Sequence, residues 1–156
     1  MKFSRPNGGT VEFHKSAAEV MCRYRQLNER DPEAGGMMLG RLVVESSDLV
    51  VDEVTEPTKL DRKGRFFFIR RRRRAQRRVN QAWLGSNGTL NYLGEWHSHP
   101  EDDPTPSHVD IENWRHISTE ARFEQGFMLF AIVGRERTRL WELRKIGGEL
   151  HQLTRK

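Results

Sequence analysis

Two histidines one residue apart, His97 and His99, are the side chains of this chain best suited to chemistry. They follow an apolar-leaning stretch, and side chains at i and i+2 of an extended strand point to the same face. Pro100 cannot donate to a strand ladder and predicts the end of that strand. Asp110 falls in the first turn of a helix predicted over 107–121 and can face back toward the imidazoles. Two histidines, one carboxylate and an open fourth position are typical of catalytic zinc, so we expect one Zn²⁺ per chain.

Each of these residues also has an ordinary structural interpretation. Histidines on a strand are commonly one buried and one solvated, and Asp110 could simply close a capping box with Ser107 at the helix start. Capping and metal ligation are compatible, because a cap fixes the chain where the carboxylate must lie. Three loop carboxylates compete as ligands but follow His99 too closely, and we expect them to be solvated: Glu101, Asp102 and Asp103.

The spacing of these residues resembles the motif of the JAMM (MPN+) zinc metalloprotease family. That motif reads His-Ser-His, seven residues, Ser, two residues, Asp, and every fixed position is met by His97, Ser98, His99, Ser107 and Asp110. The family also has an upstream glutamate, commonly before a Gly-Gly-x-x-Leu-Gly strand. Residues 33–40, Glu-Ala-Gly-Gly-Met-Met-Leu-Gly, match that pattern, and the resemblance extends over about residues 16–143.

The resemblance implies a role for each of these side chains. His97, His99 and Asp110 would hold the zinc ion. Glu33 would be the general base, which takes a proton from water and passes it to the leaving amine. Ser107 would donate a hydrogen bond to the oxyanion that forms at the attacked carbonyl.

Other assignments of the acidic and polar residues stay open at this stage. An acidic residue after a proline is common in surface turns, so Glu33 could be a surface carboxylate. Three further glutamates are alternatives for the base: Glu45, Glu53 and Glu95. Glu95 should share a strand face with His97, but a strand neighbour is poorly placed to meet the open side of a metal. Ser98 should face away from the metal, and we expect His108 and His116 to be surface residues.

The resemblance also implies an activity. The family cleaves amide and isopeptide bonds at the C-termini of ubiquitin and ubiquitin-like proteins, so a deubiquitinase-like zinc (iso)peptidase is expected. Residues 92–101 look like bacterial members, especially the small deconjugases of CBASS antiphage systems. There the implied partners are a CD-NTase and a conjugating enzyme. The alternatives are a JAMM peptidase that trims a sulfur-carrier protein, a non-catalytic MPN scaffold, and an arginine-patch nucleic-acid binder.

Length and composition limit the class of protein. A chain of 156 residues is long enough for a real core and is expected to form one domain over 1–156. No stretch approaches the roughly 18–20 apolar residues of a membrane span, and the N-terminus has no apolar signal core. One cysteine, Cys22, permits no intramolecular disulfide. We therefore expect a cytoplasmic protein with no membrane partner.

The net charge of +5 is concentrated in one run of arginines between residues 70 and 78. Seven of the 27 basic residues lie there, so the rest of the chain has 20 basic against 22 acidic residues. Like charges repel, and such a run commonly binds a partner of opposite charge. A nucleic-acid footprint is one interpretation. However, the three phenylalanines before the run, Phe66, Phe67 and Phe68, are expected to form a core strand and are not interleaved with the arginines. We therefore do not favour nucleic acid as the partner. An acidic protein partner, or an acidic patch on a substrate, explains the run as well as nucleic acid does.

The hydrophobic pattern predicts the elements that position the candidate site. An Asn-Gly-Gly turn predicts a hairpin or edge strand within 1–13, and a capping-box pattern at Ser16 opens a helix predicted over 16–30. Further strands are expected over 37–44, 49–54, 65–69, 89–96, 127–133, 138–143 and 149–153, and helices over 70–84 and 107–121. This order predicts an α/β fold with a central, mixed but mostly antiparallel sheet flanked by helices. The resemblance implies the JAB1/MPN, cytidine-deaminase-like version of that fold.

Overall fold

The computed structural model describes residues 1–70, 72–121 and 125–156. Its strands are β1 (Lys2–Ser4), β2 (Thr10–Phe13), β3 (Gly35–Leu42), β4 (Leu49–Val54), β5 (Arg62–Gly64), β6 (Phe67–Ile69), β7 (Asn91–Ser98), β8 (Phe127–Val133), β9 (Thr138–Arg144), β10 (Leu150–Gln152) and β11 (Thr154–Arg155). Its helices are α1 (Lys15–Cys22), α2 (Arg72–Gly85) and α3 (His108–Glu120).

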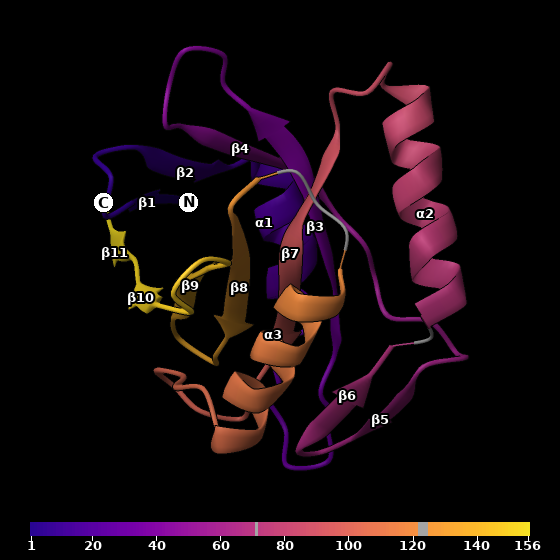
Figure 1. Cartoon of the computed structure of the whole chain (residues 1–156). Helices are drawn as coiled ribbons and strands as arrows, with labels where there is room; N and C mark the ends of the chain where they lie inside the picture. The colour runs from indigo at the N-terminus through magenta and orange to yellow at the C-terminus, as the bar shows by residue number, and fades with distance from the viewer. Residues whose placement is uncertain (71, 122–124) are drawn as a thin grey trace.

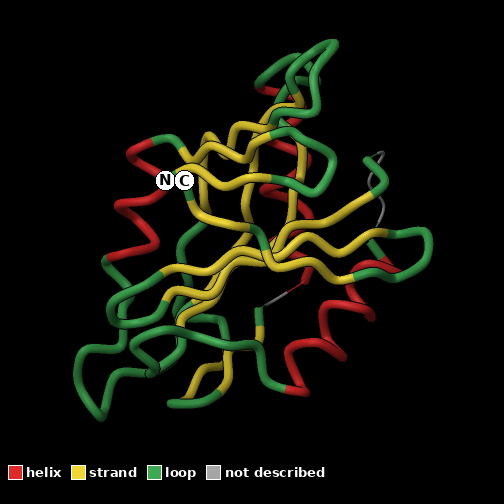
Figure 2. The backbone as a smooth tube through the Cα atoms, turned by 90° about the vertical axis from the view of Figure 1, so that its left-hand side faces the viewer, coloured by secondary structure: helices red, strands yellow, loops and turns green. Residues whose placement is uncertain are grey.

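Within the described ranges, nine strands form one sheet in the order β10-β9-β8-β7-β3-β4-β2-β1-β11. The β7–β8 and β2–β4 pairs are parallel, and the other neighbours are antiparallel. This confirms the predicted mixed, mostly antiparallel sheet. Because β11 pairs with β1, the two ends of the chain lie side by side (Figure 2).

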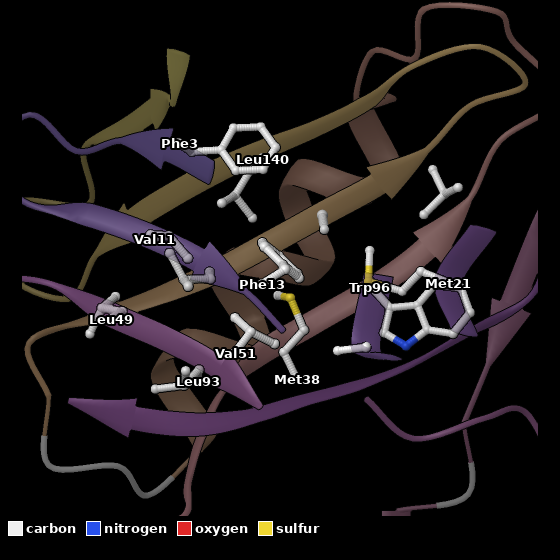
Figure 3. Packing of buried hydrophobic residues seen from close by; sticks show 14 of the residues in the cluster. Phe3, Val11, Phe13, Met21, Met38, Leu49, Val51, Leu93, Trp96 and Leu140 are labelled. Carbon is white, nitrogen blue, oxygen red and sulfur yellow. The ribbon is translucent and has the colours of Figure 1, made fainter. Parts of the chain in front are cut away.

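The two faces of the sheet are covered by different helices. Strand β8 shows the division by its alternation, since Leu129 and Ala131 join one buried cluster while Phe130 and Ile132 join the other. Helix α1 packs on the first face, where its Met21 lies beside Trp96 of β7 (Figure 3). Helix α3 covers the second face in front of β7 and β8 (Figure 1). Strand β7 is therefore central, with packed side chains on both sides.

Helix α1 is shorter than predicted. The N-terminal hairpin β1–β2 is confirmed, but the helix expected over 16–30 ends at Cys22, and its N-cap is His14 without a side-chain capping bond. The residues that follow leave the helix because Gln26 is buried and binds two backbone carbonyls outside the helix. Its Nε2 donates to the oxygens of Asp31 and Arg65 at 2.9 and 3.0 Å. The bond to Arg65 ties this segment to the β5–β6 hairpin and favours an irregular path over a longer helix.

The segment before α2 also differs from its prediction. The strand expected over 65–69, after a polar loop, is instead the separate hairpin β5–β6. The expected core strand of phenylalanines is wrong, because Phe66 is 70% exposed and Phe67 is 46% exposed. Only Phe68 turns toward the main sheet, where its ring occupies the space that a side chain at Gly35 would need.

The helix predicted over 70–84 is confirmed as α2, which buries Ala75 and Ala82 and stands beside β3 and β7 (Figure 1). Arg71, which belongs to the predicted helix start, lies outside the described residues. Among the helices that the structure describes, none is long and apolar enough to cross a membrane.

Candidate metal centre

Strand β7 carries the two histidines to its C-terminal end. His97 lies in the strand between its neighbours β3 and β8, and the amide of His99, just past the strand, donates to the Val133 carbonyl at 3.0 Å. Both imidazoles therefore have a fixed backbone. Their Nε2 atoms lie 3.0 Å apart, and their ring centroids are 4.7 Å apart. Trp114 of α3 packs against the His97 ring at 6.3 Å and holds it from the helix side.

Asp110 meets the histidines from the first turn of α3. The predicted capping box is present: the Asp110 amide donates to Ser107 Oγ, and Asp110 Oδ2 accepts from the Ser107 amide at 2.7 Å. This closes the helix start and aims the carboxylate at β7. Asp110 Oδ1 lies 3.3 Å from His97 Nε2, and Oδ2 lies 3.4 Å from His99 Nε2. In the part of the chain that the structure describes, these three residues form the group able to hold a metal ion, with one ligand atom each within 4.8 Å of the others.

The charges in this cluster are arranged as a cation site. Burial alone would raise the pKa of Asp110, but hydrogen bonds from His97 and His99 outweigh it and hold the pKa well below its ordinary value. Burial lowers the pKa of His99, and the bond to Asp110 reverses that effect, so the pKa of His99 lies above its ordinary value. The carboxylate is thus ionised and attracts positive charge. In the absence of a cation, a proton on the His99 imidazole supplies that charge.

Glu33 faces the same cluster from the segment before β3. Its amide donates to the Gly64 carbonyl of the β5–β6 hairpin at 2.7 Å, and the residue is only 5% exposed. Glu33 Oε1 lies 3.9 Å from His99 Nε2. Burial, partly offset by His99, raises the pKa of the Glu33 carboxyl from 4.5 to about 7. The structure thus brings a carboxyl that can gain or lose a proton near neutrality to the side of the histidine pair.

The three alternative glutamates lie elsewhere. Glu45 is exposed in the β3–β4 turn, with a positive φ of 56°. Glu53 accepts from Arg78 Nη2 at 2.5 Å. Glu95 accepts from Arg70 at 2.6 Å and from the Tyr92 hydroxyl at 2.8 Å. Glu53 and Glu95 are thus held by arginines and Glu45 is exposed, whereas the carboxylate of Glu33 approaches the Nε2 atom of His99.

Ser98 connects the strand of the histidines to the segment of Glu33. Its side chain is fully buried and faces away from the imidazoles, as strand alternation predicts. Its Oγ accepts from the Ala34 amide at 2.9 Å and donates to Gln26 Oε1 at 3.3 Å. The Ser98 amide also donates to the Ala34 carbonyl at 2.8 Å. Gln26, which no sequence signal marked, therefore braces Ser98 and the hairpin together.

The remaining sequence-predicted residues are placed as follows. The hydroxyl of Ser107 donates to Asp110 Oδ2 at 2.6 Å, so this side chain lies at the rim of the cluster. His108 and His116 are exposed on α3, as expected. Asp102 and Asp103 are exposed and pair with arginines of the β8–β9 turn and β9. Glu101 is also exposed, but its Oε2 lies 3.9 Å from His99 Nδ1, on the far side of that ring from the cluster.

The donor set fits zinc. Two imidazole nitrogens and one carboxylate oxygen are ligands that Zn²⁺ accepts, and three protein ligands leave one position for water or substrate. The Nε2 atoms face one another and the Asp110 oxygens, so all donors converge on one point. The absence of further cysteines excludes a thiolate-rich structural site.

Comparison with known proteins agrees with this geometry. The family of prokaryotic homologs of the JAB domain matches residues 15–144. The chain belongs to this family, which confirms the resemblance to JAMM/MPN+ proteins.

Curated relatives share one name. A Pseudomonas aeruginosa protein is 36% identical over 83% of this chain and 80% of its own length, and is named CD-NTase/cGAS isopeptidase. Proteins of the same name from Escherichia coli and Vibrio cholerae are 35% and 43% identical. They cover 89% and 74% of this chain and 86% and 70% of their own. A solution structure from Desulfitobacterium hafniense, 18% identical, aligns with a TM-score of 0.62 over 91% of this chain and 88% of that chain and shares the fold.

Proposed function

We propose that the protein is a zinc-dependent isopeptidase that removes a CD-NTase from conjugates formed through its C-terminus in a CBASS antiphage system. The observation that carries this proposal is the convergence of the His97, His99 and Asp110 donor atoms beside the buried carboxyl of Glu33. The name shared by the relatives supports a CD-NTase over a sulfur-carrier protein as the substrate. The complete ligand set argues against a non-catalytic scaffold.

In this proposal His97, His99 and Asp110 hold one zinc ion. When bound, zinc supplies a Lewis acid for the carbonyl oxygen and lowers the pKa of water to about 7. The chain fixes the geometry: β7 and the bond to Val133 orient the imidazoles, and the capping box orients the carboxylate. The positive charge of the ion would take the place of the proton on His99.

Glu33 acts as the proton carrier. One of its carboxylate oxygens takes a proton from the attacking water, and the same carboxyl gives the proton to the nitrogen of the leaving amine. Burial holds its pKa near neutrality in the metal-free protein, and a cation beside it would lower that value. The Ser107 hydroxyl donates to the oxyanion once it turns from Asp110 Oδ2, its partner in this structure.

The substrate tail approaches along the hairpin β5–β6 and the loop 100–106. Support for this comes from the bond between the Glu33 amide and Gly64, which ties the hairpin to the base. The exposed rings of Phe66 and Phe67 offer apolar contacts there. We further propose that residues 1–156 act as one domain in the cytoplasm, in company with the conjugating enzyme of the pathway.

Metal analysis and one cleavage assay test this proposal. The protein should purify with about one zinc ion per chain, and it should release a reporter protein fused to the C-terminus of a CD-NTase. A chelator should abolish the release, and added zinc should restore it. Glu33→Ala should retain zinc and lose turnover. Cleavage at the wild-type rate by Glu33→Ala would refute the assignment of the base.

A further inference from the structure

One stretch of the sequence that the metal centre does not use is rich in basic residues. Between Asp61 and Glu95 the chain has ten Arg and Lys residues and no acidic residue. These are Arg62, Lys63, Arg65, Arg70, Arg71, Arg72, Arg73, Arg74, Arg77 and Arg78. Because the whole chain has a net charge of only +5, this stretch determines where the positive charge lies.

Helix α2 presents part of this charge on one side. Ala75 and Ala82, seven residues apart, face the sheet and are buried. Arg73 and Arg77, four residues apart, lie on the opposite side of the helix and are exposed, and Arg74 beside them is exposed as well. We call Arg73, Arg74 and Arg77 the arginine face.

The arginine face has no acidic partner among the described residues, whereas its neighbours do. Arg70 pairs with Glu95 at 2.6 Å, and Arg78 pairs with Glu53 at 2.5 Å. Like charges three and four residues apart on a helix repel. Arginines near a helix N-terminus also oppose the helix dipole, and α2 has no acidic residue in its first turn. The arrangement is locally unfavourable for the isolated chain, and negative charge from another molecule would relieve it.

The chain just before α2 is tied to strand β7, which ends at the metal centre. Arg70, just before α2, is held by Glu95, which is two residues before His97 on β7. At about 3.3 Å per strand residue, that is a step of about 7 Å. The hairpin β5–β6 leads directly into α2 and contacts the Glu33 segment through Gly64. Figure 1 shows α2 standing beside β7 with its N-terminal end next to the hairpin. A protein whose tail reaches the metal would therefore have its body near α2.

We propose that the arginine face docks an acidic segment of the protein whose C-terminal tail is cleaved. This inference rests on the proposed function, because it takes the ligand of the site to be a protein. Guanidinium groups bind carboxylates through paired hydrogen bonds, so Asp and Glu side chains are the matching chemistry. Nucleic acid is less suited, since no aromatic residue lies among residues 70–78 to stack on bases.

Charge reversal on the arginine face tests the proposal. The variant carries Arg73→Glu and Arg77→Glu. The matched control carries Arg155→Glu and Lys156→Glu, which change the net charge equally at an exposed, distant edge. Two probes are cleaved: a CD-NTase with a reporter protein fused to its C-terminus, and the same reporter joined only to the C-terminal tail of that CD-NTase. A labelled peptide of alternating Asp and Glu and a single-stranded DNA oligonucleotide serve as binding probes, read by fluorescence anisotropy.

We expect the α2 variant to lose about tenfold or more in kcat/KM on the full CD-NTase fusion at low salt, through KM, and much less on the tail fusion. The loss should shrink at high salt, and the control should match the wild type. The melting temperature should not fall, because glutamates suit a helix N-terminus. The proposal would be overturned if the α2 variant lost as much kcat/KM on the tail fusion as on the full CD-NTase fusion, or if the control variant lost as much as the α2 variant. It would also be overturned if the α2 substitutions abolished DNA binding but left cleavage unchanged. If the wild type cleaves neither fusion, the proposed function fails, and binding of the acidic peptide still decides the docking surface.

Discussion

The carboxylate of Glu33 lies 3.9 Å from Nε2 of His99, although the two residues belong to different parts of the chain. Their approach depends on a double connection between Ala34 and Ser98, in which the Ser98 side chain accepts from the Ala34 amide and its own amide donates to the Ala34 carbonyl. The position of the base is thus set by the strand that carries the histidines. Any movement of that strand end would move the base and the two histidines together.

The raised pKa of Glu33 predicts a stability change that depends on pH. The folded protein holds this proton up to about pH 7, whereas an unfolded glutamate loses it near pH 4.5. Stability of the metal-free protein should therefore fall as pH rises from 4.5 to 7 because of this group. Glu33→Gln removes the effect, so the variant should be more stable than the wild type by up to about 3 kcal/mol at pH 8 and nearly equal to it at or below pH 4.5.

Denaturant unfolding in a chelator, at several pH values, measures this difference. Glu136→Gln removes an exposed carboxylate and serves as the matched control for charge. If the difference in unfolding free energy between Glu33→Gln and the wild type does not change with pH, the pKa of the Glu33 carboxyl is not raised in the folded protein.

Bound metal should stabilise the fold in a manner that depends on its ligands. A ligand at about one hundred times its dissociation constant adds about 2.7 kcal/mol to the unfolding free energy. Zinc should raise the melting temperature of the wild type and of Glu33→Gln. It should do little for His99→Ala or Asp110→Asn, whose donor atoms are lost. His108→Ala, which removes an exposed histidine of α3, should respond like the wild type. A full zinc response in Asp110→Asn would exclude that carboxylate as a ligand.

The sequence was most informative where local geometry decides the structure. The two-residue period of a strand places His97 and His99 on one side, and the Ser107 capping box fixes Asp110 in the first turn of α3. Strands β4 and β8 have the predicted bounds, because β4 alternates buried with half-buried residues and the apolar run of β8 is buried on both faces. These features depend on neighbours in the sequence, so the pattern carries them.

The sequence was least informative where distant contacts decide. Three consecutive phenylalanines have the composition of a core strand, yet only Phe68 packs toward the sheet, at a place kept open by Gly35. The apolar spacing that continues after Cys22 predicted a longer helix, but the buried amide of Gln26 binds the hairpin instead. An apolar run in the sequence does not by itself show which of its side chains are buried or which element it forms. The same limit applies to Glu33, whose approach to His99 rests on contacts with Ser98.

Ser98 should act as a positioning residue for the base. Ser98→Ala leaves the Ala34 amide without its side-chain acceptor in a buried position, which costs about 1–3 kcal/mol of stability. Because Glu33 precedes Ala34, kcat should fall by about ten- to a hundredfold while KM and zinc content change little. Ser118→Ala, a buried serine of α3, is the control for cavity formation. Retention of full kcat in Ser98→Ala would show that Glu33 is positioned without this bond.

Ser107 is predicted to contribute both to the helix cap and to catalysis, and two substitutions separate these contributions. Ser107→Ala removes the cap acceptor and should cost about 1 kcal/mol of stability, whereas glycine at an N-cap costs only a few tenths. Both substitutions remove the hydroxyl, and loss of one oxyanion donor lowers kcat by about 10²–10³-fold. Ser107→Ala and Ser107→Gly should therefore differ in unfolding free energy but share the same low kcat, with zinc retained in both, and Ser107→Thr should recover part of the rate. If kcat instead follows stability across the three variants, Ser107 serves the helix cap alone and the oxyanion donor is another group.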